Sequence, residues 1–277
     1  MSKKEVVVFI AKACFAGVAI GFGAVASLLA NSLLAGLAGK LVGGCLFTVG
    51  MFIIISYDMR LFTGMVASVP DLGAKNLWRL PLCFFCNAVG IGVVAVLARF
   101  SFSGDALAAQ AASLMQSKLN DDLWYVKDFC SAVLCGVLIT FSVRSVQAAP
   151  RKGLNPTLGV VFPIAVFAFC GFDHSVANML YFYYLGDISW KIVGYILITV
   201  IGNFLGGGFF PFAVWVVRRQ RALQGDGAAE KVANAANAAT DTPKDEEDSD
   251  KDGKHAGMSE KSRTAQPFGS SDLAIKS

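Results

Sequence analysis

Histidine is scarce in this chain. Only two histidines occur among the 277 residues, His174 inside an apolar segment and His255 near the C-terminal end. An enzyme built around His174 would need chemical partners, yet the apolar segments contain no second histidine, no cluster of metal-ligand residues and no nucleophile motif. We therefore expect no enzymatic activity, no cofactor and no metal.

Charged residues are also few, and they are not clustered. Asp, Glu, Lys and Arg make up 16% of the chain, with a formal net charge of +4. The basic residues are spread over loops, which speaks against binding of nucleic acid. Hydrophobic residues reach 55% and form runs of about 20, the length needed to cross roughly 30 Å of hydrocarbon. The composition predicts an all-α integral membrane protein embedded in a lipid bilayer.

Six apolar segments predict six transmembrane helices. They lie at 6–30, from 41 to about 57, at 77–98, at 126–146, from 156 onward and at 190–217. After Arg218 large apolar residues become rare and charges frequent, so this part cannot bury enough surface to offset its ordering entropy. We predict a pore domain at 1–218 and a disordered cytoplasmic tail at 219–277.

The distribution of basic residues predicts the orientation. An even number of spans places both termini on one side, and the loops on that side hold most of the Lys and Arg residues. Such an excess marks the cytoplasmic side. We expect a multi-pass protein of the plasma or inner membrane with both termini in the cytoplasm.

Two of the apolar segments are interrupted by glycine and polar residues. The second contains YDMRLFTG at 57–64, and the fifth contains CGFDH at 170–174. Interrupted segments at corresponding positions of two halves point to a transport site. Spans one to three and four to six would form two inverted three-helix repeats, because three is odd. Titratable residues inside spans mark a pathway by default, which singles out His174, with Thr63 at the other break.

Three motifs give the chain a resemblance to a known family. They are LFTG at 61–64, GFDHSVANM at 171–179 and IGNFLGG at 201–207. Together they resemble the formate/nitrite transporter family, over roughly residues 9–217. The resemblance implies a homopentamer of aquaporin-like protomers. Each protomer would conduct small monovalent anions or their conjugate acids: formate foremost, with nitrite, hydrosulfide, acetate and lactate as further substrates of the family.

The resemblance also implies a central site in each pore. The central histidine falls on His174 and its threonine partner on Thr63. The two aromatic residues of the constriction fall on Phe47 and Phe167. The apolar residue beside the threonine falls on Leu61.

Further polar residues are assigned around this site. The lysine of the inner vestibule falls on Lys12, and the outer lysine falls on Lys118, with Lys127 as the alternative. Asn178, one turn after the histidine, is expected to help hold the imidazole. Asn203 is expected to supply a polar group to the pore.

The chain departs from the family pattern at two positions. Arg60 stands where the family usually has an acidic residue, and Asp58 lies two residues earlier. Gly136 stands where the family often has asparagine in the fourth span, which would leave Asn203 as the lone polar group of its kind.

The predicted constriction decides which form of the substrate crosses. Removing an anion from water costs on the order of 20 kcal/mol in an idealised apolar medium, and less after relaxation. Protonating formate at pH 7 costs only about 4 to 5 kcal/mol, at about 1.36 kcal/mol per pKa unit. The sequence therefore favours passage as the neutral acid, with proton coupling at low pH. The alternative is a channel for neutral solutes such as water or glycerol.

Overall fold

The structure is a computed structural model that describes residues 1–240 except 35, 153–154 and 187–188. All regular secondary structure in these described residues is helical, as the sequence predicted. The elements are α1 (Lys3–Leu33), α2 (Gly36–Ser56), α3 (Phe62–Val66), α4 (Val69–Leu72), the 3₁₀ helix η1 (Ala74–Asn76), α5 (Arg79–Arg99), α6 (Gly104–Leu119), α7 (Trp124–Lys152), α8 (Pro156–Cys170), α9 (Met179–Leu185) and α10 (Trp190–Thr240).

Five of the described helical stretches are long and apolar enough to cross a membrane. They are Lys3–Leu33, Gly36–Ser56, Ala74–Arg99, Trp124–Gln147 and Trp190–Ala222. The fifth predicted span corresponds to α8, which is apolar but has only 15 residues because the helix ends before Gly171. Multiple spans are thus supported, while the sixth span stays a prediction.

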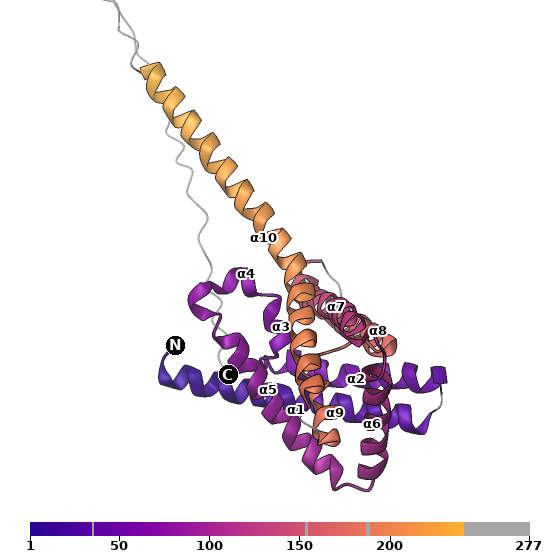
Figure 1. The fold of residues 1–277 in the computed structure, drawn as a ribbon. Helices are drawn as coiled ribbons and strands as arrows, with labels where there is room; N and C mark the ends of the chain where they lie inside the picture. Colours follow the sequence, from indigo (N-terminus) through magenta and orange to yellow (C-terminus); the bar gives the residue numbers. More distant parts are fainter. Residues whose placement is uncertain (35, 153–154, 187–188, 241–277) are drawn as a thin grey trace, which may run out of the picture. The chain divides into compact units, whose positions relative to one another are not determined.

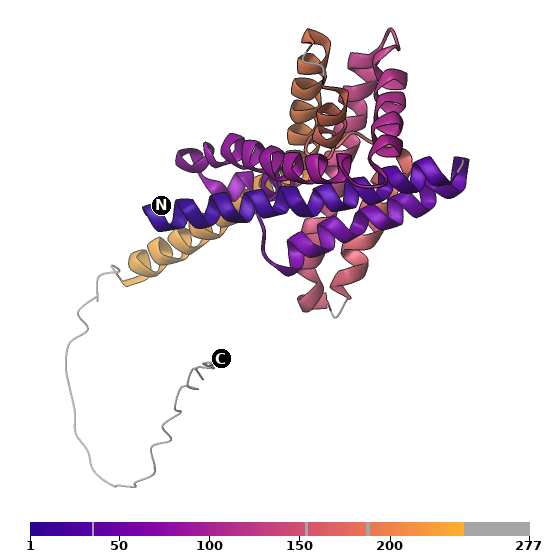
Figure 2. The same cartoon turned by 90° about the horizontal axis from the view of Figure 1, so that it is seen from below.

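The helices of residues 1–226 form one compact unit. Helix α1 lies side by side with α2 and also packs along α5 (Figures 1 and 2). Helix α8 packs between α2 and α7. This packing brings the two interrupted segments, at the ends of α2 and α8, into the same region of the unit.

Close helix contacts explain one departure from the family pattern. A Cβ atom on Gly136 of α7 would lie 2.5 Å from the carbonyl oxygen of Asn203 on α10. Only glycine allows the two helices to approach this closely. Gly136 therefore belongs to this helix contact, and its link to a missing polar group of the pore stays a prediction.

Helix α6 was not predicted from the sequence. Its buried residues Leu107, Ala111 and Met115 recur every four positions, so a single narrow face packs inward against α1 and α9. The opposite face is exposed, which kept the segment below the hydropathy of a span. Helix α6 matters for the site because its last turn carries Lys118.

The predicted tail begins as a helix. Helix α10 continues through Arg218 as far as Thr240, whereas the sequence analysis expected disorder from residue 219. This stretch is rich in alanine, the residue with the highest helix propensity. Residues Gly227–Ser277 belong to a second unit. Residues 241–277 of the predicted tail lie outside the described residues.

Candidate functional site between two pockets

The first interruption follows a defined way of ending a helix. At the end of α2 the Asp58 N–H donates to the Ile55 carbonyl (3.3 Å), and the Met59 N–H donates to the Ile54 carbonyl (2.9 Å). This pair of bonds is the Schellman motif, whose left-handed residue is usually glycine. Here Asp58 takes that conformation, with φ of 47°. The chain thereby leaves the helix at Asp58.

The second interruption has the same geometry 113 residues later. The Gly171 N–H donates to the Ala168 carbonyl (3.2 Å), and the Phe172 N–H donates to the Phe167 carbonyl (3.0 Å). Gly171 has φ of 70° and occupies the left-handed position with the usual residue type. Both breaks therefore end their helices by the same hydrogen bonds.

Asn203 fastens the second break to the neighbouring helices. Its Oδ1 accepts from the Ser175 N–H, and its Nδ2 donates to the Asp173 and Ala132 carbonyls, each at 2.8 Å. The residue between the two clamped positions is His174. The side chain of Asn203 is fully buried and saturated by backbone groups, so it positions the loop and lines neither of the two pockets described below.

Asn87 of α5 fastens the first break in the same way. Its Oδ1 accepts from the Phe62 N–H (2.8 Å), and its Nδ2 donates to the Arg60 and Ala13 carbonyls (2.9 and 2.8 Å). Leu61 lies between the clamped positions, as His174 does in the other break. The sequence analysis missed Asn87, although a lone asparagine in an apolar segment was a usable signal.

The hydrogen bonds of His174 fix its tautomer. Its Nδ1 lies 2.9 Å from the backbone N of Ala177, which can only donate, so Nδ1 accepts and carries no proton. The neutral ring then carries its proton on Nε2, 3.0 Å from Thr63 Oγ1, and donates to that oxygen. The Thr63 hydroxyl hydrogen has no other acceptor among the described residues, so it remains free to donate. The predicted pair of His174 and Thr63 is thus in direct contact.

The two predicted aromatic residues lie against this pair. The ring centroids of Phe47 and Phe167 are 5.2 Å apart in an edge-to-face arrangement. Phe167 stacks on the His174 imidazole, with centroids 5.8 Å apart and an interplanar angle of 23°. Both phenyl rings are buried, so the imidazole and the Thr63 hydroxyl lie in an apolar environment.

Asp173 points away from its neighbour His174. Its carboxylate accepts from Lys118 Nζ, from Ser131 Oγ (2.7 Å) and from the Tyr195 hydroxyl. These donors come from three helices, α6, α7 and α10. The carboxylate therefore ties the second break to its surroundings and does not face the imidazole.

The predicted role of Asn178 is not what its contacts show. Its Nδ2 donates to the Asp173 carboxylate (3.0 Å), so the side chain does not hold the imidazole. Its backbone N–H donates to the His174 carbonyl (2.9 Å) and helps to close the turn after the break. Asn178 contributes to the site by holding Asp173 and the backbone of His174.

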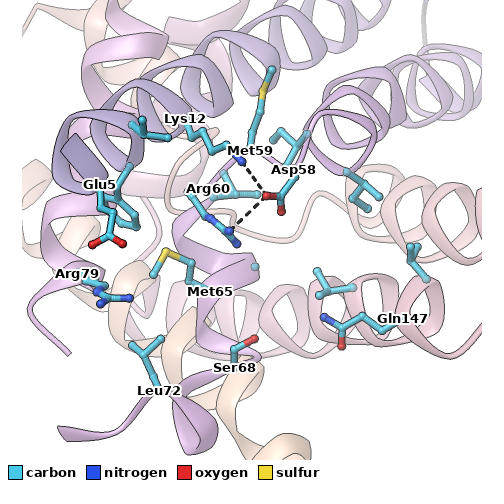
Figure 3. Close-up of a pocket in the computed structure, with 18 of the residues that line it drawn as sticks. Glu5, Lys12, Asp58, Met59, Arg60, Met65, Ser68, Leu72, Arg79 and Gln147 are labelled. Atoms are coloured by element: carbon cyan, nitrogen blue, oxygen red, sulfur yellow. Dashed lines mark hydrogen bonds and ion pairs between the residues drawn. The ribbon is translucent and has the colours of Figure 1, made fainter. Parts of the chain in front are cut away.

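Two pockets include residues of the two breaks in their linings, and the two sets of lining residues are different. The Lys118 pocket has a volume of about 330 Å³ and is lined by Phe47, Phe167 and His174, among others. The Lys12 pocket, shown in Figure 3, has a volume of about 640 Å³. Leu61 is among the residues that line it. Among the described residues none lines both pockets: His174 of the second break lines the Lys118 pocket, and Leu61 of the first break lines the Lys12 pocket.

Lys118 fits the role of the predicted outer lysine better than the alternative, Lys127. Lys118 lines the pocket named after it and also donates to the Gly171 carbonyl at the second break (3.2 Å). Lys127 pairs with Asp121 and lines neither of these two pockets.

The Lys12 pocket contains a charged cluster that explains the unusual Arg60. One carboxylate oxygen of Asp58 lies 2.7 Å from Lys12 Nζ and 3.3 Å from Arg60 Nη2 (Figure 3). The hydrogen bond from Lys12 lowers the pKa of Asp58 below its ordinary value, and the charge of Arg60 acts in the same direction against partial desolvation. Arg60 is thus paired with the carboxylate of Asp58, two residues earlier in the chain.

Comparison with known proteins identifies the family. A family model described as "Formate/nitrite transporter" matches residues 2–217 of the chain. The chain belongs to the formate/nitrite transporter family. As a member of this family it is an integral, multi-pass membrane transporter, and its relatives are transporters or channels, not enzymes.

Individual members of the formate/nitrite transporter family resemble the chain over most of its length. A "Probable formate transporter" of Methanothermobacter thermautotrophicus is 28% identical over 232 residues, covering 70% of this chain and 82% of the relative. A solved "FNT family ion channel" has a TM-score of 0.67 and 23% identity, covering 78% of this chain and 92% of the other. A solved "Pentameric formate channel with formate bound" has a TM-score of 0.65 and 21% identity, covering 79% and 99%.

Proposed function

We propose that this chain conducts small monovalent anions or their conjugate acids, formate first among them, between the Lys12 pocket and the Lys118 pocket. The observation that carries the proposal is the hydrogen bond between Thr63 and His174 beside two phenyl rings. His174 lines the Lys118 pocket, and Leu61, two residues before Thr63, lines the Lys12 pocket. A hydroxyl donor in an apolar constriction fits a substrate that accepts hydrogen bonds. The family membership supports the same conclusion.

The tautomer of His174 defines what the centre offers to a substrate. The imidazole donates to Thr63, which polarises the hydroxyl and leaves its hydrogen free for an oxygen of formate. A carboxylate or carboxylic acid satisfies this donor, and the phenyl rings exclude the water that would otherwise compete.

The same tautomer limits the source of the coupled proton. A second proton on His174 would have to bind Nδ1, which already faces the Ala177 N–H. Two donors would then oppose each other in a buried place. We therefore infer that the substrate takes its proton from solvent in a pocket, and that His174 stays neutral while the acid crosses.

The architecture belongs to the same proposal. The matching Schellman turns and asparagine clamps favour two inverted three-helix repeats, with six spans in an aquaporin-like protomer. The solved pentameric formate channel of similar fold favours a homopentamer. Cytoplasmic termini remain the orientation favoured by the basic loops.

Flux measurements in proteoliposomes test the function. Purified protein is reconstituted, and uptake of formate, nitrite, hydrosulfide, acetate and lactate is measured at two pH values. We expect saturable formate uptake that increases as the external pH falls, because more substrate is then protonated. Water or glycerol flux without anion uptake would instead indicate the neutral-solute channel.

A further inference from the structure

Asp58 lies between the two cations nearest to it in the Lys12 pocket (Figure 3). One of its oxygens contacts both Lys12 and Arg60, as the carboxylate of a bound substrate would. We propose that Lys12 and Arg60 form a binding site for a small monocarboxylate, and that Asp58 is a built-in competitor that fills this site until substrate displaces it. This inference rests on the proposed function.

The backbone does not explain why position 58 is an aspartate. The left-handed conformation of Asp58 is one that glycine adopts without strain. The second break has the same turn and uses Gly171 there. Aspartate tolerates the conformation better than most residues, but it is not required. The carboxylate at Asp58 is therefore explained by its contacts with Lys12 and Arg60.

The strength of the contacts suits a competitor that can be displaced. The side chains of Lys12, Asp58 and Arg60 are 36%, 67% and 44% exposed. Exposed ion pairs of this kind favour the paired state by at most a factor of about five. A diffusing carboxylate finds the same two donors with the same chemistry, and a guanidinium is well suited to it.

The other charged groups of the pocket do not take over the role of Asp58. The charged side chains that line it are Lys4, Glu5, Lys12, Asp58, Arg60 and Arg79. Glu5 is engaged in the cap of α1, where it accepts from the Ser2 N–H (2.6 Å). The Nε of Arg79 is buried without a partner among the described residues, so this cation adds to the attraction for anions.

Acidification does not release Asp58 near neutral pH. Because Lys12 lowers the pKa of Asp58, the ion pair is fully present above the ordinary pKa of an aspartate. It is lost only as the pH falls through the lowered value. Between pH 5 and 8 the competitor stays charged, so substrate concentration, not pH, controls its displacement.

The experiment replaces Asp58 by asparagine. Asparagine has nearly the same size and also adopts the left-handed conformation, so Asp58→Asn removes the charge without altering the end of α2. Formate flux is measured in oriented proteoliposomes. Met1 lines the same pocket, so a protease-cleavable tag at the N-terminus marks this side. We expect the apparent KM from the Lys12 side to fall by up to about fivefold, with the KM from the other side unchanged.

Two matched variants separate competition from other effects. Glu5→Gln removes a negative charge from the same pocket without touching Lys12 or Arg60, so it reports the effect of net charge alone. Asp105→Asn breaks a 2.7 Å pair with Arg99 that lies in neither of the two pockets. We expect both variants to retain the wild-type KM.

Two results would overturn the inference. If the wild type transports formate and Asp58→Asn leaves the KM unchanged, Asp58 does not compete with substrate. If Glu5→Gln lowers the KM as much as Asp58→Asn, net charge accounts for the effect. A wild type that moves no formate would instead overturn the proposed function, and this inference with it.

Discussion

Replacing Thr63 tests the centre of the site most directly. Thr63→Val keeps the branched shape of the side chain but removes the hydroxyl that accepts from His174 and is free to donate to substrate. Thr63→Ser is the matched control, because it keeps the hydroxyl and loses only one methyl group. The valine variant replaces the hydroxyl by a methyl group, and the serine variant loses only the methyl group, so only the valine variant lacks the donor.

The structure sets the size of the expected effect. A hydrogen bond to the neutral acid contributes about 0.5 to 1.5 kcal/mol, which corresponds to roughly 2- to 13-fold in rate. In Thr63→Val the Nε2–H of His174 is also left without its acceptor inside a buried centre. The lost methyl of Thr63→Ser costs about 0.8 kcal/mol, or about fourfold. We expect formate flux to fall about tenfold in the valine variant and only slightly in the serine variant.

Stopped-flow uptake of formate into proteoliposomes measures this difference. Size-exclusion chromatography of both variants first shows that the oligomer is intact, so that a loss of flux reports the pore. Equal flux through Thr63→Val and Thr63→Ser would refute the role of the hydroxyl, and with it the proposal that the Thr63–His174 pair carries the function.

Four further variants have definite expected outcomes. His174→Ala should leave the oligomer folded but change anion selectivity, and unchanged relative uptake of formate, nitrite and acetate would contradict this. In the double variant Phe47→Ala/Phe167→Ala the constriction admits water, so anion current should appear at neutral pH. In the wild type, an anion current equal to the tracer flux of formate would rule out passage as the neutral acid. Asn203→Leu orphans two buried backbone groups of the second break, the Ser175 N–H and the Asp173 carbonyl, at about 1 to 3 kcal/mol each, which should lower the melting temperature clearly. Gly136→Asn should prevent monodisperse assembly, since its Cβ would meet backbone at 2.5 Å, and normal chromatography would contradict that packing.

Much of the fold was predictable because its signals are local. Apolar runs marked the helices, and glycine with polar residues marked the places where α2 and α8 end. The contact between Thr63 and His174, 111 residues apart, followed only from the resemblance to a family. Hydropathy alone contains no information about which breaks meet.

The remaining features depend on packing and could not be derived from the sequence. The direction of the Asp173 carboxylate is set by Lys118 on α6, a helix whose narrow apolar face gives a weak periodic signal. The role of Asn87 depends on the backbone groups that the first break leaves unpaired. At position 136 a motif gives only the residue type. That the neighbour of Gly136 is the backbone of α10 follows from the packing alone.

The fixed direction of the hydrogen bonds at His174 determines whether bare protons can leak through the protein across the membrane. A bare proton could hop through the centre only by binding Nδ1 on one side and leaving from Nε2 on the other. The Ala177 N–H occupies the first of these places. The centre therefore interrupts a proton wire even when water fills both pockets. A membrane containing many copies of this protein would keep its electrochemical proton gradient, and acid equivalents would cross only together with substrate.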